Sequence, residues 1–347
     1  MPAPRPQVED IDAPRLGPTW HDLVHADDQP MIAIPELEPA AIRAARDAVD
    51  PAFLGAPQFV HEALSARLGA PVIVKVETVN PIRSFKGRGT SVVVRALAAD
   101  GRIGPDRPVV CASAGNFGQG VAFAARRLDI PTVVFASRVA NAGKVARMRA
   151  LGATVIQVGD DFDAARAAAD AHAVQTGAHL LVDGDDPRIA AGAGTMALEL
   201  TEGVEAGDLP APAVAFVPVG NGALINGVGA WLRHAHPGCR VVGIQAEGAP
   251  AMTLSWRAGR AIDTEAVSTY ADGIAARVSI PAAVAAMAGR VDEMRLVDDD
   301  ALRSAQDELT MELGVTVEGA AAASWAGALA GPRPDGPAVL IITGSNV

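Results

Sequence analysis

Short apolar segments alternate along this chain with longer, alanine-rich amphipathic segments, and this alternation constrains the fold more than any other feature. Eight apolar segments are typical of buried strands, at 71–77, 108–114, 131–137, 153–159, 178–184, 213–220, 240–248 and 338–344. Amphipathic segments between them have the apolar spacing of helices, at 91–100, 118–129, 144–152, 163–177 and 225–238. Alternating strands and helices build a mostly parallel sheet covered by helices on both faces. The sequence therefore predicts an α/β protein.

Composition and charge exclude several classes of protein. Half of the 347 residues are apolar, 20% are charged and the mean hydropathy is +0.22, so sizeable cores are expected. A net charge of −11 argues against nucleic-acid binding, which needs a basic face. No apolar run reaches the roughly 18 residues of a membrane span. The proline-rich residues 1–17 lack the pattern of a signal peptide, and the first fifty or so residues are expected to form an irregular arm.

The cysteines and histidines indicate the compartment and the absence of a metal site. Cys111 and Cys239 cannot build a disulfide framework, and Cys111 is interpreted as a core residue. No cysteine or histidine spacing is typical of a zinc site. The sequence therefore predicts a cytoplasmic protein without a metal.

Two loops that follow predicted strands carry residues suited to an amine and a carboxylate. Ligands of parallel sheets bind at the carboxyl ends of the strands, so these loops are expected to lie together. The first loop, 79–91, contains Lys86, which is either an ordinary surface lysine or an amine held for chemistry. The second, 113–120, reads SAGNFGQG and opens a helix. Its N–H groups and short polar side chains suit an anionic group such as a carboxylate.

A third loop, 219–229, suits a phosphate. Gly220 and Gly222 allow the backbone to approach a ligand closely, and the start of the following helix offers free N–H donors. The loop is not a G-x-G-x-x-G motif, because Ile225 occupies the last glycine position, and no Walker sequence occurs in the chain. Together, the three loops predict a site for a cofactor that carries an aldehyde and a phosphate.

These segments resemble the fold-type-II family of pyridoxal-phosphate enzymes, in its serine/threonine dehydratase branch. Residues 75–89, KVETVNPIRSFKGRG, are similar to the lysine motif of that family, and 113–135 resemble its substrate-carboxylate loop and helix. Residues 217–228, VPVGNGALINGV, resemble its phosphate loop, while 271–275 and the closing 340–347, LIITGSNV, resemble further family segments. The resemblance runs from about residue 50 to the C-terminus.

The resemblance implies a two-lobed α/β fold in which each lobe is a mostly parallel twisted sheet flanked by helices. Its large lobe would comprise residues 1–94 and 186–347, and its small lobe residues 95–185. The cofactor would be pyridoxal 5′-phosphate, the substrate a small amino acid and the assembly a homodimer. No nucleic-acid or membrane partner is expected.

The resemblance also implies a role for each residue that stands at a motif position of the family. Lys86 would hold the cofactor as a Schiff base and then remove the α-proton of the substrate; the amine must be neutral to react, so apolar neighbours and a cationic environment are expected around it. Phe85 would pack near the cofactor ring, Asn116 would bind its 3-hydroxyl and Thr343 would face its pyridine nitrogen. Glu318 is a possible further residue near the ring.

Two sets of residues would bind the anionic groups. The substrate carboxylate would lie against Ser113, Ala114, Gly115 and Asn116. The phosphate would accept hydrogen bonds from the N–H groups of Gly220, Asn221, Gly222, Ala223 and Leu224.

The reaction expected from these residues is an elimination. The hydroxyl of Thr343 cannot stabilise a protonated pyridine nitrogen as a carboxylate would, and the resulting weaker electron sink favours prompt loss of a β-substituent over transamination. The expected reaction is α,β-elimination of water from an L-β-hydroxy amino acid such as threonine or serine, giving a 2-oxo acid and ammonia. Ala114 stands where racemases of this branch have a serine base, so racemisation is expected to be weak.

Three alternatives stay open at this point. The first is β-replacement by a second nucleophile, as in cysteine-synthase-like enzymes. The second is elimination of ammonia from a diamino acid. The third belongs to another class and is a non-catalytic protein that binds pyridoxal phosphate or an amino acid.

Several positions depart from the family pattern or have an ordinary structural interpretation. Phe117 stands where the dehydratases usually have histidine, which indicates either local repacking or an altered substrate. Gln245 stands where their divalent-cation site would have glutamate, and a neutral amide is a poor ligand for a hard cation. Lys144 and Arg147 are interpreted as part of a solvated helix face.

Overall fold

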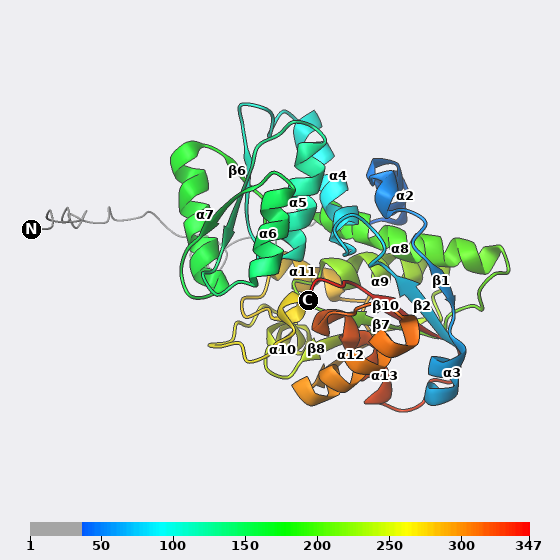
Figure 1. The fold of residues 1–347 in the computed structure, drawn as a ribbon. Coiled ribbons are helices and arrows are strands. Elements are labelled where there is room, and N and C mark those ends of the chain that lie inside the picture. Colours follow the sequence, from blue (N-terminus) through cyan, green and yellow to red (C-terminus); the bar gives the residue numbers. More distant parts are fainter. Residues whose placement is uncertain (1–36) are drawn as a thin grey trace, which may run out of the picture. The chain divides into compact units, whose positions relative to one another are not determined.

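The computed structural model describes residues 37–347, which contain two mostly parallel sheets flanked by helices (Figure 1). This confirms the predicted α/β fold class. Of the predicted irregular arm, residues 1–36 lie outside the described residues. For residues 39–48 the prediction was wrong, because they form helix α2 (Pro39–Ala48), which buries Ile42 and Ala45.

The larger sheet has six strands in the order β1-β2-β10-β7-β8-β9. Their bounds are β1 (Gln58–Val60), β2 (Val72–Val76), β10 (Ala338–Ile342), β7 (Val214–Pro218), β8 (Arg240–Ala246) and β9 (Glu293–Val297). All neighbours pair in parallel except β1, which is antiparallel to β2. Leu340 of the C-terminal strand pairs with Val74 on one side and Phe216 on the other. The end of the chain therefore lies between β2 and β7.

The smaller sheet has four parallel strands in the order β5-β4-β3-β6. These are β3 (Val109–Ala112), β4 (Thr132–Ala136), β5 (Thr154–Gln157) and β6 (His179–Leu180). All four lie within residues 95–185, while the strands of the larger sheet lie outside that range. The division into lobes at 95 and 185 itself stays a prediction.

Helices follow most strands. They are α3 (Glu62–Leu68), α4 (Lys86–Ala99), α5 (Asn116–Arg126), α6 (Ala142–Ala150), α7 (Phe162–Thr176), α8 (Pro187–Glu205), α9 (Ala223–Ala235), α10 (Ala251–Ala258), α11 (Pro281–Met287), α12 (Asp299–Leu313) and α13 (Gly319–Leu329), with 3₁₀ turns η1 (Pro51–Phe53) and η2 (Asp272–Ile274). In residues 37–347, no helix combines the length and apolarity that crossing a bilayer requires.

Alternating residues of the larger sheet face two different cores. Val74, Phe216 and Leu340 pack with residues of α12 and α13, including the fully buried Trp325. The residues between them, such as Ile341, pack into the core that contains α4, α8 and α9. The parallel sheet is therefore covered on both faces, as its continuous apolar strands predict.

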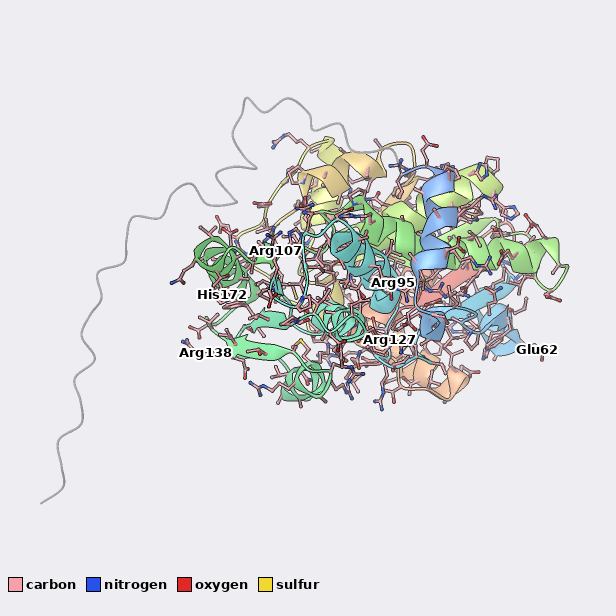
Figure 2. All side chains as sticks on the ribbon, turned by 90° about the horizontal axis from the view of Figure 1, so that it is seen from above. Glu62, Arg95, Arg107, Arg127, Arg138 and His172 are labelled. Atoms are coloured by element: carbon pink, nitrogen blue, oxygen red, sulfur yellow. The ribbon has the colours of Figure 1, made fainter. Side chains whose placement is uncertain are left out.

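The segment before β1 is tied to the end of α5. Asp50 is buried and accepts two hydrogen bonds from the guanidinium of Arg127, at 2.7 and 3.1 Å. Burial raises the pKa of Asp50, but the hydrogen bonds from Arg127 and Ala52 outweigh it, so the pKa lies below its usual value. Arg95 of α4, labelled with Arg127 in Figure 2, adds to this lowering. One buried carboxylate thus connects this segment to the helix layer.

Helices α8 and α9 approach each other through glycine. A Cβ atom at Gly227 of α9 would lie 2.1 Å from the carbonyl oxygen of Ala190, and one at Gly194 of α8 would lie 2.8 Å from the carbonyl oxygen of Gly227. These contacts leave no room for a side chain, so the glycines set the distance between the helices.

Replacing Gly227 by alanine is expected to destabilise the protein by about 1–3 kcal/mol, because the added methyl group forces α8 and α9 apart. The urea midpoint of unfolding measures the effect. Gly238→Ala is the control, since a Cβ atom there has open space around it. Equal midpoints for the two variants would contradict the close contact.

Candidate active site

The loop that delivers Lys86 is organised by one asparagine. Asn80 accepts hydrogen bonds from the N–H groups of Ile82 and Ser84, both at 3.2 Å, and donates to the carbonyl oxygens of Glu77 and Ser84. Arg83 has a φ of 53°, in the left-handed region. The loop therefore has a defined shape between the end of β2 and Lys86, the first residue of α4.

The loop is also bonded to the segment that follows the C-terminal strand. The N–H group of Phe85 donates to the carbonyl oxygen of Thr343 at 3.0 Å, and that of Ser345 donates to Arg83 at 3.0 Å. The side chain of Thr343 is buried. These bonds place the lysine loop directly beside the residue that the sequence assigned to the pyridine nitrogen.

The amine of Lys86 lies among one carboxylate and two aromatic rings. Its Nζ atom is 2.6 Å from Oδ2 of Asp183, and the side chains of these residues are only 15% and 13% exposed. The same Nζ lies 5.0 Å from the ring centroid of Phe85 and 5.9 Å from that of Phe117. The apolar neighbours agree with expectation. The expectation of a cationic environment was wrong, because the polar partner of the Lys86 amine is the carboxylate of Asp183.

The predicted phosphate loop lies next to Asp183. Nδ2 of Asn221 is 3.5 Å from Oδ2 of Asp183, and a Cβ atom at Gly184 would lie 2.8 Å from the carbonyl oxygen of Asn221. Gly222 has a φ of 91° and precedes α9 without a side-chain cap. Within the described residues, no backbone N–H group from Gly220 to Leu224 donates a hydrogen bond. The loop thus presents unused donors at a helix start.

The predicted carboxylate loop forms the start of α5. The hydroxyl oxygen of Ser113 accepts hydrogen bonds from the N–H groups of Gly115 and Gly118, at 3.0 and 2.8 Å. A Cβ atom at Gly115 would lie 2.5 Å from the stem of Lys144, so a side chain there would displace Lys144. Ser113 is therefore already engaged in shaping its own loop, and Ala114 is half-buried beside it.

Asn116 joins the carboxylate loop to Glu318. Its Nδ2 donates to Glu318 at 2.8 Å, and its Oδ1 accepts from Asn346 at 2.8 Å. Arg147 donates to Asn346 at 2.7 Å, so this residue of α6 contributes to the network. Burial raises the pKa of Glu318 to about 7, and the charge of Lys144 only partly opposes this. The position predicted near the ring thus holds a carboxyl group that titrates near neutrality.

Lys144 does not lie on a solvated face, and that interpretation was wrong. Its side chain is 5% exposed, and its Nζ is 2.5 Å from Oδ2 of Asp272 in the turn η2. The apolar spacing of α6 does not reveal this, because the partner comes from a distant segment.

Two residues with structural interpretations lie in the core. Cys111 is fully buried in β3, and burial raises the pKa of its thiol to about 12. Gln245 is buried in β8, where its Oε1 accepts hydrogen bonds from Thr253 at 2.8 and 2.9 Å. No group of metal-binding side chains occurs in the described part of the chain.

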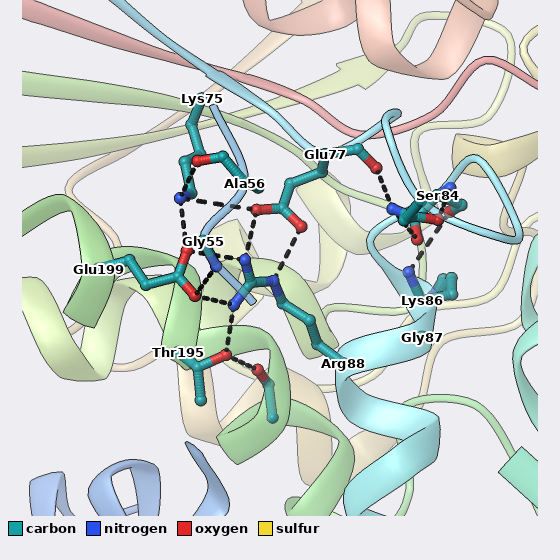
Figure 3. Close-up of polar contacts among 12 residues, drawn as sticks. Gly55, Ala56, Lys75, Glu77, Ser84, Lys86, Gly87, Arg88, Thr195 and Glu199 are labelled. Atoms are coloured by element: carbon teal, nitrogen blue, oxygen red, sulfur yellow. Dashed lines mark hydrogen bonds and ion pairs between the residues drawn. The ribbon is translucent and has the colours of Figure 1, made fainter. Parts of the chain in front are cut away.

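A cluster of buried charges fixes the start of α4 (Figure 3). Arg88 is fully buried and donates to both oxygens of Glu77, at 2.8 and 2.9 Å, and to both oxygens of Glu199, at 2.9 and 2.8 Å. Lys75 adds a bond to Glu199 at 2.6 Å. Two cations and two carboxylates balance in this cluster, and every partner is hydrogen-bonded. Lys86, the first residue of α4, lies two positions before Arg88.

Comparison with known proteins identifies the family. The sequence profile of the family described as "Pyridoxal-phosphate dependent enzyme" matches residues 49–344. The chain belongs to this family. It is a pyridoxal-phosphate-dependent enzyme of fold type II, as its sequence motifs predicted.

Several relatives place it within the family. An L-threonine ammonia-lyase of Thermotoga maritima is 37% identical over 285 residues, which cover 82% of this chain and 69% of the relative. The processed form of threonine deaminase isoform 2 from Solanum lycopersicum superposes with a TM-score of 0.79 at 29% identity, covering 89% of this chain and 88% of the other. Maize serine racemase superposes with a TM-score of 0.81 at 27% identity, covering 89% and 94%.

The residues present fit pyridoxal phosphate. The unused backbone N–H donors of residues 220–224, with the left-handed Gly222, could hold the phosphate at the start of α9. The amine of Lys86 could bond to the aldehyde. It lies near the phosphate loop, because Asp183 contacts both Lys86 and Asn221. Thr343 lies beside the lysine loop, where its hydroxyl could contact the pyridine nitrogen. Asn116 can still donate a second N–H to the 3-hydroxyl, although its other atoms are engaged.

Sequence reasoning missed Asp183 and Asn346. Asp183 follows a two-residue strand within a segment interpreted only as a strand, although the ends of parallel strands are where such enzymes bind ligands. That rule could have revealed it. Asn346 bonds to Ile82, Asn116 and Arg147, and no local pattern indicates those distant partners.

Glu199→Gln is expected to lower the free energy of unfolding at pH 7 by about 3 kcal/mol, because Arg88 and Lys75 lose half of their neutralising charge. Burial opposes ionisation, but hydrogen bonds and charge from Arg88 and Lys75 lower the pKa of Glu199 to about 2. This stabilisation is present above the unfolded value of 4.5 and is lost as the pH falls from there to about 2.

Urea unfolding of wild type and variant at pH 3 and pH 7 measures this difference. The gap between them should shrink at pH 3. Glu202→Gln, three residues along α8, is the control, because its ion pair with Arg46 is exposed and is worth at most about 0.5 kcal/mol. A loss for Glu202→Gln as large as for Glu199→Gln would contradict the role of the buried cluster.

Proposed function

We propose that this enzyme catalyses α,β-elimination of water from an L-β-hydroxy amino acid, with L-threonine and L-serine as substrates and a 2-oxo acid and ammonia as products. The observation that carries the proposal is the convergence of Lys86, the carboxylate loop and the phosphate loop at one place. Lys86 lies within 5.9 Å of the ring of Phe117 and is joined to Asn221 through Asp183. The relatives named above act on threonine or serine, which supports this substrate class.

Each group has a defined task in this reaction. Pyridoxal phosphate, when bound, supplies the electron sink that makes the α-proton of an amino acid acidic. Lys86 accepts that proton at Nζ. The N–H groups at the start of α5 hold the carboxylate of the substrate, so that its α-carbon faces Lys86. The hydroxyl group leaves from the β-carbon as water, and the released enamine hydrolyses to the 2-oxo acid and ammonia.

Glu318 and Asn116 orient the ring in this proposal. Glu318 accepts a hydrogen bond from Asn116, and the second N–H of the Asn116 amide would donate to the ring hydroxyl of the bound cofactor. The neutral hydroxyl of Thr343 would face the pyridine nitrogen, which would favour elimination over transamination. We place the enzyme in the cytoplasm as a homodimer, in keeping with its predicted class.

Lys86→Ala is expected to lower the release of 2-oxo acid and ammonia from L-threonine and L-serine by about 10³-fold or more, because it removes both the amine that binds the aldehyde and the base. Lys86→Arg is the matched variant, which keeps the charge but cannot bond to the aldehyde. The chain has only three lysines, Lys75, Lys86 and Lys144.

Borohydride reduction of the loaded enzyme followed by peptide mass spectrometry therefore identifies the lysine that holds the cofactor. Modification of Lys86 alone is expected. Labelling of Lys75 or Lys144 instead would overturn the assignment. Cofactor on Lys86 without product from threonine or serine, but with product once a second nucleophile is added, would favour β-replacement.

Elimination is expected without racemisation. Ala114 has no group that could deliver a proton to the face of the substrate opposite Lys86, so D-serine should form from L-serine at least about 100-fold more slowly than pyruvate. Chiral chromatography of the reaction mixture measures both products. D-serine formation at a rate close to elimination would contradict the role given to Ala114.

A further inference from the structure

Asp183 is a carboxylate inside the site whose bonding is incomplete. It follows β6 in a loop, and its Oδ2 lies 2.6 Å from Nζ of Lys86. Its second oxygen, Oδ1, is buried and accepts no hydrogen bond from any residue in the range 37–347. The contact of Oδ2 with Asn221, at 3.5 Å, is too long to be a strong hydrogen bond. One oxygen of the carboxylate therefore lacks a hydrogen-bond partner among the described residues.

The cation beside Asp183 in this structure is the ammonium group of Lys86, which two aromatic rings also face. Besides the carboxylate, the rings of Phe85 and Phe117 lie 5.0 and 5.9 Å from the ammonium group of Lys86. Aromatic faces within about 6 Å attract ammonium groups, and desolvation strengthens the attraction. A histidine at position 117, as the dehydratases usually have, would add a hydrogen-bond donor where this chain offers only a ring face. Phe117 and Asp183 thus favour the same kind of ligand.

Neighbouring groups do not cancel the charge of Asp183. The thiol of Cys111 beneath it is neutral, because burial and the nearby Asp183 raise its pKa to about 12. Asp185 and Asp186 follow in the same loop, and Arg188 is already bonded to Asp186 at 2.9 Å. Lys86 is therefore the cation that faces Asp183 in the described structure.

The reacting part of a substrate must come close to this carboxylate. A base acts on a proton within hydrogen-bond reach, about 3 Å, so the α-carbon of the substrate approaches Nζ of Lys86. The β-substituent is one bond further along, which brings it within a few ångströms of Asp183. A carboxylate there attracts a β-ammonium group and repels a β-carboxylate or β-phosphate.

We propose that the site also eliminates ammonia from L-2,3-diamino acids, with Asp183 and Phe117 binding the side-chain ammonium group. This rests on the proposed role of Lys86. The Cα–H bond breaks and its proton goes to Nζ of Lys86; the Cβ–N bond breaks and its electron pair leaves with ammonia. The enamine then takes up water, so that L-2,3-diaminopropionate and one water give pyruvate and two ammonia. The β-amine is already protonated, so it leaves as ammonia without a general acid. The carboxylate of Asp183 beside it therefore only has to bind the ammonium group.

Asp183→Asn in the cofactor-loaded enzyme tests the proposal, with L-2,3-diaminopropionate, L-serine and L-threonine as separate substrates. The variant keeps the shape of the side chain and removes its charge. Because Asp183 also contacts Lys86, kcat/KM is compared between substrates: the value for diaminopropionate is expected to fall at least about 10-fold more than that for serine. Asp185→Asn, the same change two residues along the loop, is the control and should alter neither.

A binding measurement separates recognition from catalysis. L-2,4-diaminobutyrate has a side-chain ammonium group but no β-leaving group, and L-norvaline is its uncharged analogue of the same length. Calorimetry should show that the wild-type enzyme binds diaminobutyrate at least about 10-fold more tightly than norvaline, and that Asp183→Asn removes this preference.

The outcomes separate this proposal from the function proposed above. Turnover of serine and threonine without turnover of diaminopropionate would overturn the diamino-acid activity alone. An equal loss of kcat for all three substrates in Asp183→Asn, with unchanged preference for diaminobutyrate, would show that Asp183 only positions Lys86 and would also overturn it. Turnover of diaminopropionate without turnover of serine or threonine would support this inference and refute the dehydration.

Discussion

The buried guanidinium of Arg88 is the contact on which the position of the reactive lysine depends. It joins β2, through Glu77, to α8, through Glu199, and it belongs to α4 itself. Residues two apart on a helix point to nearly opposite sides, because each residue turns the helix by about 100°. With Arg88 fixed in the core, Lys86 points to the other side of α4, toward Asp183. The lysine motif therefore combines one residue for anchoring with one for chemistry.

The three lysines of the chain show that burial alone does not mark a reactive amine. Each bonds to a single close carboxylate oxygen, in Glu199, Asp183 and Asp272. Lys75 is the most buried, and burial lowers its pKa against the pull of Glu77 and Glu199, yet it lies in the middle of a strand surrounded by protein. Lys86 is the most exposed of the three and begins α4, after the loop that follows β2. Access at the carboxyl end of a parallel sheet distinguishes it.

The sequence predicted those parts of the fold that have a local pattern. Short apolar runs predicted eight of the strands, but β9, whose sequence EMRLV mixes charged and apolar residues, has no such run. Helix α8 was not predicted because nearly every residue from Ile189 to Leu200 is buried, and a helix buried all round lacks an amphipathic period. The six-stranded order, with the last strand beside β2, depends on contacts between residues far apart in the sequence.

The residues of the candidate site likewise differ in whether a local sequence pattern reveals them. Lys86 and the two glycine-containing loops could be found from short motifs, because backbone N–H groups and glycines work wherever the chain places them. Asp183 could not be paired with Lys86 from a pattern, since 97 positions separate them. The neutral or charged state of Glu318 likewise depends on burial among Asn116, Asn346 and Lys144, which come from three different segments.

The contacts that the helices and loops around the site make with one another change from polar to apolar with distance from Lys86. At the site, they are polar pairs: Lys86 with Asp183, Asn116 with Glu318 and Lys144 with Asp272. Behind it, α4 packs against α5 and α8 through apolar residues such as Val93 and Val121 in one continuous core. A polar pair can exchange its partner for an ionic ligand at little net cost, whereas separating an apolar contact exposes its surface to water. A charged amino acid is therefore best accommodated at the polar edge, among these three pairs.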